Sequence, residues 1–290
     1  MKKIWRWIRW ALLAGVVLIL CSWIYAMIAV RGTFVAFRPA TNAGGEAVEA
    51  GAPGHRIVGR VYLSGAPDAA APVVFILHGD APFIHPGYQY GVADDIAKAA
   101  PGTRVVGLMR PGYADRYGAR SDGDRGFASG ENYTAEVAHD LAEAMRELER
   151  KWQAPSVVLV GHSGGAAIAA DIAATEPGLV HHVFLVACPC DVPAFRRHMA
   201  ALQRSPMWLW PARSLSPIEA LDRMDRATIV TAFSGSEDPL TLPAYAEAYV
   251  AKARSLGMTA NLVTMPGKGH EILDDPAVEA AVAEASRERR

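Results

Sequence analysis

Short runs of apolar, mostly β-branched residues alternate with longer amphipathic segments from residue 73 to the end of the chain. The apolar runs predict buried strands at residues 73–77, 104–109, 156–160, 182–187, 227–233 and 260–265. The segments between them predict helices at residues 90–100, 132–152, 242–256 and 274 to the end. Buried strands that alternate with helices favour an α/β protein with a doubly wound, mostly parallel sheet.

Two regions depart from this alternation. In residues 56–63 apolar and polar residues alternate weakly, which predicts an early antiparallel strand. Residues 189–226 hold two helical stretches around Pro206-Met207-Trp208-Leu209-Trp210-Pro211. An insertion at that point lies over the carboxyl ends of the strands, where such sheets bind ligands, so we expect a small helical lid there. Trp208 and Trp210 either line an apolar substrate pocket, pack the lid onto the domain or touch lipid, and the sequence leaves these roles open.

The first 31 residues differ from a soluble domain. Lys2, Lys3, Arg6 and Arg9 precede residues 11–30, which carry no charge and as a helix span about 30 Å, the thickness of a bilayer core. The basic excess before this run places the N-terminus in the cytoplasm. We expect an uncleaved single-pass anchor at residues 1–31. A cleaved signal peptide and a buried soluble helix are the alternatives, but the run is longer than an ordinary signal core and lacks a small-x-small cleavage site.

Composition adds limits to this organisation. Residues 32–55 are rich in Gly, Ala and Pro and predict a linker, which leaves residues 56–290 as one folded domain. A net charge of −1 gives no reason to expect a nucleic-acid partner. Three cysteines are too few for a disulfide scaffold, and we expect no metal site. The sequence leaves open whether Cys188 and Cys190, separated by one residue, form a disulfide.

The strand at residues 156–160 leads into the sequence Gly161-His162-Ser163-Gly164-Gly165, which an Ala-rich run follows. A Ser on a tight strand-to-helix turn is exposed at the carboxyl end of the sheet, and the close neighbours of such a turn must be small. Ser163 is therefore the candidate nucleophile. The alternative is a structural turn in which this Ser caps a helix.

A serine hydroxyl needs a base and an acid that orients the base. His270 follows the last predicted strand in a glycine-rich loop and is the candidate base. Asp238 follows the strand before it and is the candidate acid, with Glu237 as the runner-up. The chain order Ser, acid, His is the order expected for this architecture.

A tetrahedral intermediate needs backbone donors for its oxyanion. The Gly164 N–H at the start of a helix is one candidate, and the Asp80 N–H in the loop after residues 73–77 is the other. We expect His78 to brace this loop rather than to act as a second base.

From about Arg56 onward the chain resembles the α/β-hydrolase superfamily. The motifs that carry the resemblance are His78-Gly79, Arg110-Pro111-Gly112-Tyr113, Gly161-His162-Ser163-Gly164-Gly165, Gly235-Ser236-Glu237-Asp238 and Gly269-His270. The resemblance implies the fold, a Ser163/Asp238/His270 triad, oxyanion amides at Gly164 and Asp80, and no cofactor; it implies no particular substrate. Asp80 departs from many relatives, and its carboxylate would repel an anionic substrate, hold a substrate amine or pair with Arg110.

Together these features predict a serine hydrolase of carboxylic esters or thioesters that works through an acyl-enzyme. Its expected partners are a small-molecule ester or acyl substrate and the lipid bilayer around the N-terminal helix. The expected location of the catalytic domain is the periplasmic or extracellular face of the membrane. An exopeptidase or amidase of the same fold, with Asp80 holding an amine, and a tethered binding protein without turnover are the alternatives.

Overall fold

The computed structural model describes residues 2–33, 44–81, 85–126 and 129–287. Its centre is an eight-stranded sheet in the order β1-β2-β4-β3-β5-β6-β7-β8. β1 pairs antiparallel with β2 and β2 pairs antiparallel with β4, whereas every later pairing is parallel. The doubly wound, mostly parallel sheet predicted from the sequence is therefore confirmed. The strands are β1 (Glu46–Ala50), β2 (Ile57–Tyr62), β3 (Val73–Leu77), β4 (Arg104–Leu108), β5 (Val157–His162), β6 (His182–Val186), β7 (Ile229–Gly235) and β8 (Ala260–Met265).

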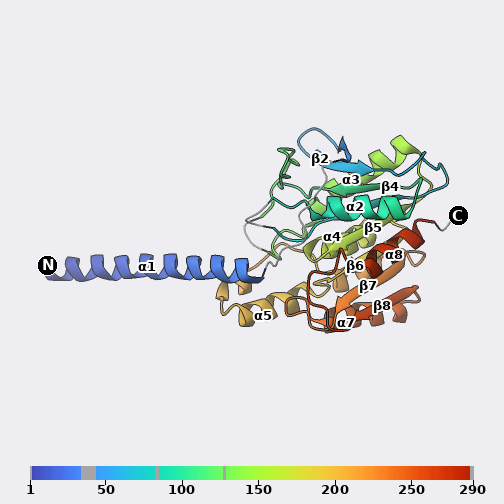
Figure 1. Ribbon diagram of the computed structural model, residues 1–290. Helices are drawn as coiled ribbons and strands as arrows, with labels where there is room; N and C mark the ends of the chain where they lie inside the picture. The colour runs from blue at the N-terminus through green and yellow to red at the C-terminus, as the bar shows by residue number, and fades with distance from the viewer. Residues whose placement is uncertain (1, 34–43, 82–84, 127–128, 288–290) are drawn as a thin grey trace.

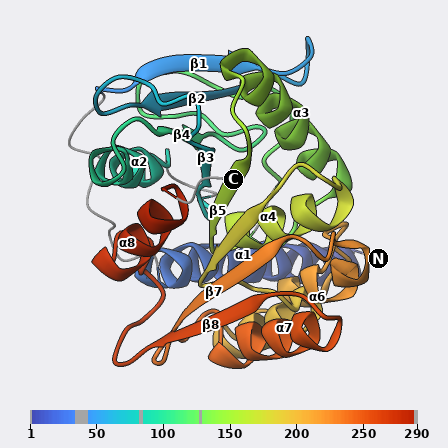
Figure 2. The ribbon, with the colours of Figure 1, turned by 90° about the vertical axis from the view of Figure 1, so that its right-hand side faces the viewer.

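Helices cover both faces of this sheet (Figure 2). α2 (Tyr88–Ala99) and α8 (Pro276–Ala285) lie on one face, and α3 (Ala135–Trp152), α4 (Gly164–Thr175) and α7 (Pro243–Ser255) lie on the other. Successive strand residues point to opposite faces, so Phe75 packs under α3 and α4 while Ile76 packs under α2. Both faces are buried, which explains why the parallel strands are apolar at nearly every position.

The predicted linker at residues 32–55 is wrong in its second half, because β1 joins the sheet there. Glu49 accepts a hydrogen bond of 2.7 Å from Arg56 Nη1, and Ala50 belongs to the buried core under α3. Four of the five β1 residues are exposed or half-buried, because β1 is an edge strand. Its short segment therefore lacks the apolar run that marks the central strands.

The N-terminus forms one long helix, α1 (Lys2–Thr33), which contains an apolar span from Lys3 to Tyr25 (Figure 1). None of the residues in its most apolar window is buried against the rest of the protein. By length and composition this helix can cross a bilayer, and a signal sequence has the same features.

The segment between β6 and β7 forms the small helical insertion expected at residues 189–226. It contains α5 (Val192–Leu202), the 3₁₀ turn η1 (Pro206–Leu209), α6 (Pro217–Ala220) and the 3₁₀ turn η2 (Leu221–Arg223). Asp191 caps the start of α5 by accepting a hydrogen bond of 2.9 Å from the Ala194 N–H. Cys188 and Cys190 are joined by a disulfide just before this cap.

Candidate active site

Ser163 occupies a strained turn between β5 and α4. Its φ of 53° and ψ of −123° lie outside the regions that non-glycine residues ordinarily adopt. The backbone holds this conformation through the Ser163 N–H, which donates to Val186 O at 2.9 Å, and the Ser163 carbonyl, which accepts from Ala166 N–H at 2.9 Å. A Cβ on Gly161 would collide with the carbonyl of Gly165, so the turn needs a glycine there. The tight turn predicted for Ser163 is present, and Ser163 itself is half-buried in it.

The structure brings Ser163, His270 and Asp238 into one hydrogen-bonded line. His270 Nε2 lies 3.0 Å from Ser163 Oγ, and His270 Nδ1 lies 2.8 Å from Asp238 Oδ2. The three residues follow β5, β8 and β7, all at the carboxyl ends of parallel strands. The runner-up, Glu237, is not in this line; its backbone N–H donates to Lys268 O at 2.9 Å.

Charge in this line is stabilised by the surrounding donors. Burial alone would raise the pKa of Asp238, but hydrogen bonds from His270, Thr241 and the Leu240 N–H lower it below its ordinary value. Burial would lower the pKa of His270, and the Asp238 hydrogen bond and charge raise it above 6.5. The arrangement keeps Asp238 ionised and makes His270 a stronger base than a free imidazole.

Thr241 is a member of the site that the sequence did not indicate. Its hydroxyl donates to Asp238 Oδ2 at 2.5 Å, and its backbone N–H donates to Asp238 Oδ1 at 3.0 Å. Asp238 therefore has a fixed orientation before it meets His270. Asp238 also accepts from the Leu240 N–H two residues on at 2.8 Å, as in an Asx turn, so the local signal for this turn is the Asp itself.

His162, the second residue of the nucleophile motif, connects the two sides of the site. Its Nε2 lies 3.2 Å from the His270 carbonyl oxygen and its Nδ1 lies 3.1 Å from the Tyr88 hydroxyl, which accepts a hydrogen bond of 2.5 Å from the Gly79 N–H. Burial, together with the charge of His270, lowers the pKa of His162 to about 3, so the ring is neutral. The directions then follow: Tyr88 donates to Nδ1 and Nε2–H donates to His270.

The loop after β3 is braced by His78, as expected. His78 Nδ1 lies 2.7 Å from Gly79 O, and its Nε2 accepts from the Arg110 N–H at 3.2 Å. Burial, with the charge of Arg110, lowers the pKa of His78 to about 3. A neutral, doubly hydrogen-bonded ring of this kind is structural rather than a second base.

Asp80 pairs with Arg110, which is one of the three roles that the sequence left open for the Asp80 carboxylate. Asp80 Oδ1 lies 2.9 Å from Arg110 Nη1, while Oδ2 accepts from Tyr133 Oη at 2.6 Å and from the Gly130 N–H at 2.8 Å. The ion pair is buried, with side-chain exposures of 9% for Asp80 and 2% for Arg110. We call Asp80, Arg110, Tyr133 and Gly130 the Asp80 network.

The Asp80 network lies directly against the start of α4. A Cβ built on Gly164 would be 2.6 Å from Asp80 Oδ1 and 2.6 Å from Tyr133 Oη. In the described part of the chain, neither the Asp80 N–H nor the Gly164 N–H donates to another protein group. Gly164 follows Ser163 directly, and a Cβ built on Gly79, the residue before Asp80, would be 2.9 Å from Ser163 Cβ. Both amides proposed for the oxyanion therefore belong to segments that border Ser163.

The two lid tryptophans have different surroundings. Trp208 is buried, its ring meets the Phe195 ring edge-on at 5.7 Å, and its Nε1–H donates to Gln203 Oε1 at 2.8 Å. Trp210 is 66% exposed. Trp208 therefore packs the lid, and a substrate-binding role for either residue stays a prediction.

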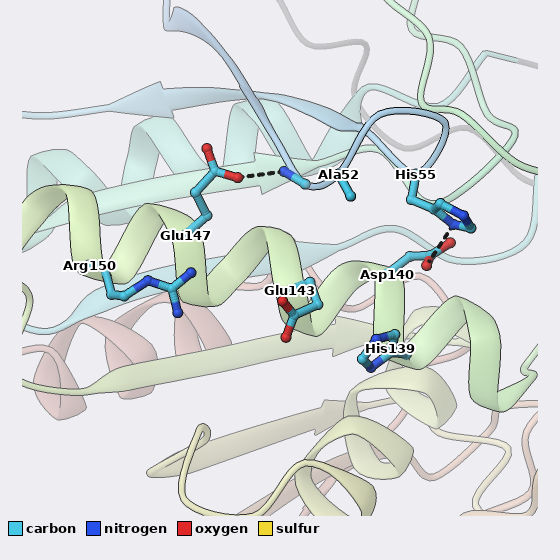
Figure 3. A pocket seen from close by; sticks show the side chains of 8 residues that line it. Ala52, His55, His139, Asp140, Glu143, Glu147 and Arg150 are labelled. Atoms are coloured by element: carbon cyan, nitrogen blue, oxygen red, sulfur yellow. Dashed lines mark hydrogen bonds and ion pairs between the residues drawn. The ribbon is translucent and has the colours of Figure 1, made fainter.

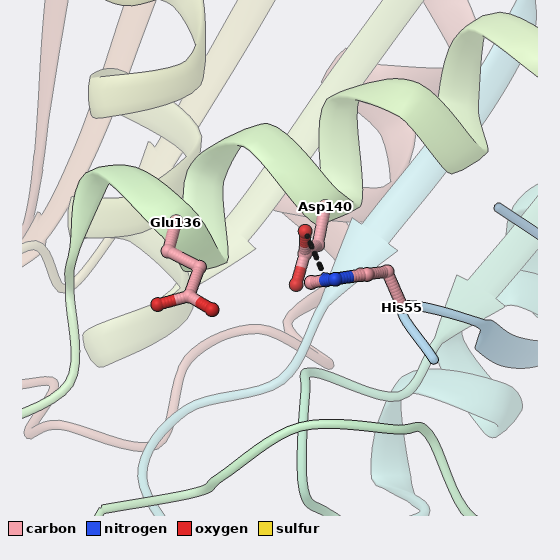
Figure 4. A group of neighbouring side chains, drawn as sticks. All are labelled: His55, Glu136 and Asp140. Atoms are coloured by element: carbon pink, nitrogen blue, oxygen red, sulfur yellow. Dashed lines mark hydrogen bonds and ion pairs between the residues drawn. The ribbon is translucent and has the colours of Figure 1, made fainter. Parts of the chain in front are cut away.

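One surface cluster outside this site has the chemistry of a metal site. Possible ligand atoms of His55, Glu136 and Asp140 all lie within 4.8 Å of one another (Figure 4). His55 Nδ1 is 3.0 Å from Asp140 Oδ1, and this hydrogen bond raises the pKa of His55. Nitrogen and carboxylate ligands suit Zn²⁺ and similar ions. The cluster borders a cavity of about 220 Å³ between α3 and the β1–β2 turn, where Glu147 accepts from the Gly51 N–H (Figure 3). It shares no residue with the Ser163 site.

Comparisons with known proteins agree with this geometry. The Hydrolase_4 family model, described as serine aminopeptidase, S33, matches residues 69–230, more than half of the chain. No curated protein matches the chain by sequence.

Solved structures give the same fold at low identity. An esterase from Pyrobaculum calidifontis is 16% identical, with a TM-score of 0.60 over 90% of this chain and 88% of that one. A puromycin hydrolase (15% identical, TM-score 0.63) matches 87% of this chain and 39% of its own. An acylaminoacyl peptidase from Pyrococcus horikoshii (14% identical, TM-score 0.60) matches 83% of this chain and 40% of its own. In the last two, the similarity spans about two fifths of the larger protein.

Proposed function

This chain belongs to the Hydrolase_4 family of serine hydrolases with the α/β-hydrolase fold, and we propose that it cleaves carboxylic esters or thioesters through an acyl-enzyme. The observation that carries the proposal is the line of hydrogen bonds from Ser163 Oγ through His270 to Asp238, with distances of 3.0 Å and 2.8 Å. A nucleophile, a base and an orienting acid in this order are the requirement for acyl transfer.

Each residue has one role in the proposed reaction. Ser163 Oγ attacks the substrate carbonyl while His270 Nε2 takes its proton, and Asp238 stabilises the imidazolium. The Gly164 and Asp80 amides donate to the oxyanion. His270 then protonates the leaving group, and an acyl group remains on Ser163. A water molecule, deprotonated by His270, attacks this acyl group and releases the acid.

The state of Asp80 argues against the amine-binding role that the exopeptidase alternative gives to this residue. An aminopeptidase needs a carboxylate that can bind the substrate ammonium group. Arg110, Tyr133 and the Gly130 N–H already satisfy the Asp80 carboxylate, so it has no free charge to offer. The description of the family model keeps peptidase activity as the second candidate.

The proposed location rests on α1. We expect this helix to remain as an anchor, because four basic residues precede its uncharged residues 11–30 and favour a cytoplasmic N-terminus. The hydrolase domain is then on the outer face of the cytoplasmic membrane. An oxidising compartment also suits the disulfide between Cys188 and Cys190.

Two experiments test these proposals. Purified protein and its Ser163→Ala variant are compared on short p-nitrophenyl esters and on aminoacyl p-nitroanilides, and separate samples of each are labelled with a fluorophosphonate probe. We expect labelling and ester turnover that the variant lacks; turnover of anilides alone would refute the ester assignment. For the location, alkaline phosphatase fused to the C-terminus should be active, and an inactive fusion would refute the outer-face assignment.

A further inference from the structure

We propose that residues 202–213 of the lid form a docking surface for an anionic lipid bilayer, so that the active site takes its ester substrate from the membrane. This surface, here called the lid face, consists of Leu202, Arg204, Leu209, Trp210 and Arg213. The inference rests on the proposed function, since it assumes an anchored hydrolase.

Exposed apolar side chains are concentrated on the lid face. Outside α1, the large hydrophobic residues exposed in the described part of the chain are Leu63, Tyr117, Leu202, Leu209, Trp210 and Val263. Three of the six lie between residues 202 and 210, and Leu209 (62%) and Trp210 (66%) are the most exposed of all six. The surface of a soluble protein seldom has several exposed apolar side chains close together, whereas Trp and Leu together are typical of side chains at a membrane interface.

The lid holds these side chains outward by contacts on its inner side. Trp208, which directly precedes Leu209 in the sequence, packs against Phe195 and donates a hydrogen bond to Gln203. Arg196 Nη2 donates to the Trp210 carbonyl at 2.9 Å, and its Nη1 donates to the Gly130 carbonyl at 2.9 Å. Leu209 and Trp210 therefore point away from a fixed base, and little ordering is needed when they enter the interface.

The charge of the lid fits an anionic surface. No Asp or Glu occurs between Asp191 and Glu219, whereas this stretch contains four arginines. Arg197, Arg204 and Arg213 are exposed. The whole chain has a net charge of only −1, so this excess of positive charge is local. Arginines beside exposed apolar residues are the combination that binds anionic headgroups and the acyl boundary together.

The anchor keeps the lid face within reach of the bilayer. Residues 34–45 separate α1 from β1, and a chain of that length spans at most about 40 Å. Binding of the lid face is then an intramolecular event at high effective concentration, so a weak interfacial surface is sufficient.

Docking by the lid orients the active site. The lid leaves the sheet directly after β6, at the same carboxyl edge where Ser163 and His270 lie. Tyr133 of the Asp80 network also bonds to this segment, since its N–H donates to Ser214 Oγ at 3.0 Å. With the lid on the bilayer, the substrate class that reaches Ser163 most readily is a lipid-resident ester.

The first test uses the full chain in vesicles. In a Cys21→Ser background, Leu209→Cys and, as a matched control, Val263→Cys on β8 are labelled with an environment-sensitive nitrobenzoxadiazole dye. In vesicles of equimolar phosphatidylcholine and phosphatidylglycerol, we expect a blue shift of the Leu209→Cys emission relative to detergent, and none for Val263→Cys. Equal emission at the two sites would overturn the proposal. A shift in detergent that grows with protein concentration would assign the lid face to a second copy and would also overturn it.

The second test separates docking from catalysis. Leu209→Asp is compared with the unmodified protein on a soluble p-nitrophenyl ester and on a fluorescent acyl ester dissolved in the same vesicles. We expect unchanged turnover of the soluble ester and about a tenfold loss on the vesicle substrate. An equal effect on both substrates would refute docking. If the unmodified protein turns over neither ester, the proposed function fails, whereas the dye measurement still decides the docking.

Discussion

Asp80 Oδ2 accepts a hydrogen bond of 2.6 Å from the Tyr133 hydroxyl, and Asp80 Oδ1 and Tyr133 Oη both lie against Gly164 at the start of the nucleophile helix. Asp80 comes from the loop after β3 and Tyr133 from the residues before α3, so their bond joins segments 53 residues apart. The backbone amides of Asp80 and Gly164 are the proposed oxyanion donors, and their spacing therefore depends on a side-chain bond.

Removal of this bond should lower kcat. In Tyr133→Phe, Asp80 keeps Arg110 and the Gly130 N–H but loses its shortest contact. A hydrogen bond to a charged group contributes about 1.5–3 kcal/mol, so a loss of this size from the transition state lowers kcat by about ten- to a hundredfold. We expect KM to change little. An unchanged kcat, measured on a soluble ester, would show that the oxyanion loop does not need this bond.

The buried ion pair should be sensitive to the loss of one partner. Arg110→Met leaves the Asp80 carboxylate without its counter-charge in the interior, which destabilises proteins by about 3–5 kcal/mol. Arg146→Met, which breaks the more exposed pair with Glu176 at 2.6 Å, is the matched control and should cost less than about 1 kcal/mol. Urea denaturation measures the free energy of unfolding of both variants. Equal losses would contradict the conclusion that the Asp80–Arg110 pair is a buried ion pair.

Activity should rise with pH through a value above 6.5. His270 must be neutral to accept the Ser163 proton, and the Asp238 hydrogen bond raises the pKa of His270 above 6.5. The same shift affects stability: the stabilisation is fully present below pH 6.5 and is lost as the pH rises through the pKa of the folded state. Asp238→Asn should move the acid limb of kcat/KM to lower pH and reduce activity strongly, as a pH–rate profile will show.

The charge of Glu271 should also affect the pH at which the acid limb of the pH–rate profile lies. Burial raises the pKa of the Glu271 carboxyl to about 7, and its charge in turn raises the pKa of His270. In Glu271→Gln we expect the acid limb to shift to lower pH with nearly unchanged activity at high pH. Because the pKa of Glu271 is raised on folding, the native protein loses stability as the pH rises from 4.5 through 7. The variant should lack that loss in thermal melts recorded across this range.

The disulfide gives a prediction that needs no enzyme assay. Of the three cysteines, Cys21 is free and the other two are paired. Denatured, unreduced protein should therefore bind one equivalent of a maleimide, and reduced protein three. The loop that the disulfide closes contains one residue, so reduction should change the melting temperature little. Three reactive thiols before reduction would contradict the pairing.

The sequence was sufficient to predict the sheet and the line of Ser163, Asp238 and His270. These features have strong local signals: apolar runs for central strands, glycines around a tight turn, and polar residues directly after strands. β1 was missed because an edge strand needs few apolar residues. Tyr88, Tyr133 and Thr241 were missed for another reason, since each meets its partner only after distant segments or a turn have folded.

The contact between Gly164 and the Asp80 network also restricts how this sequence can diverge. A side chain at position 164 would occupy the space of the Asp80 and Tyr133 oxygens, so an alanine there requires the loss or displacement of that pair. Conversely, a chain without the pair has room for a larger residue after the nucleophile. Substitutions at Gly164, Asp80 and Tyr133 should therefore be correlated among related hydrolases, although the three positions are far apart in the sequence.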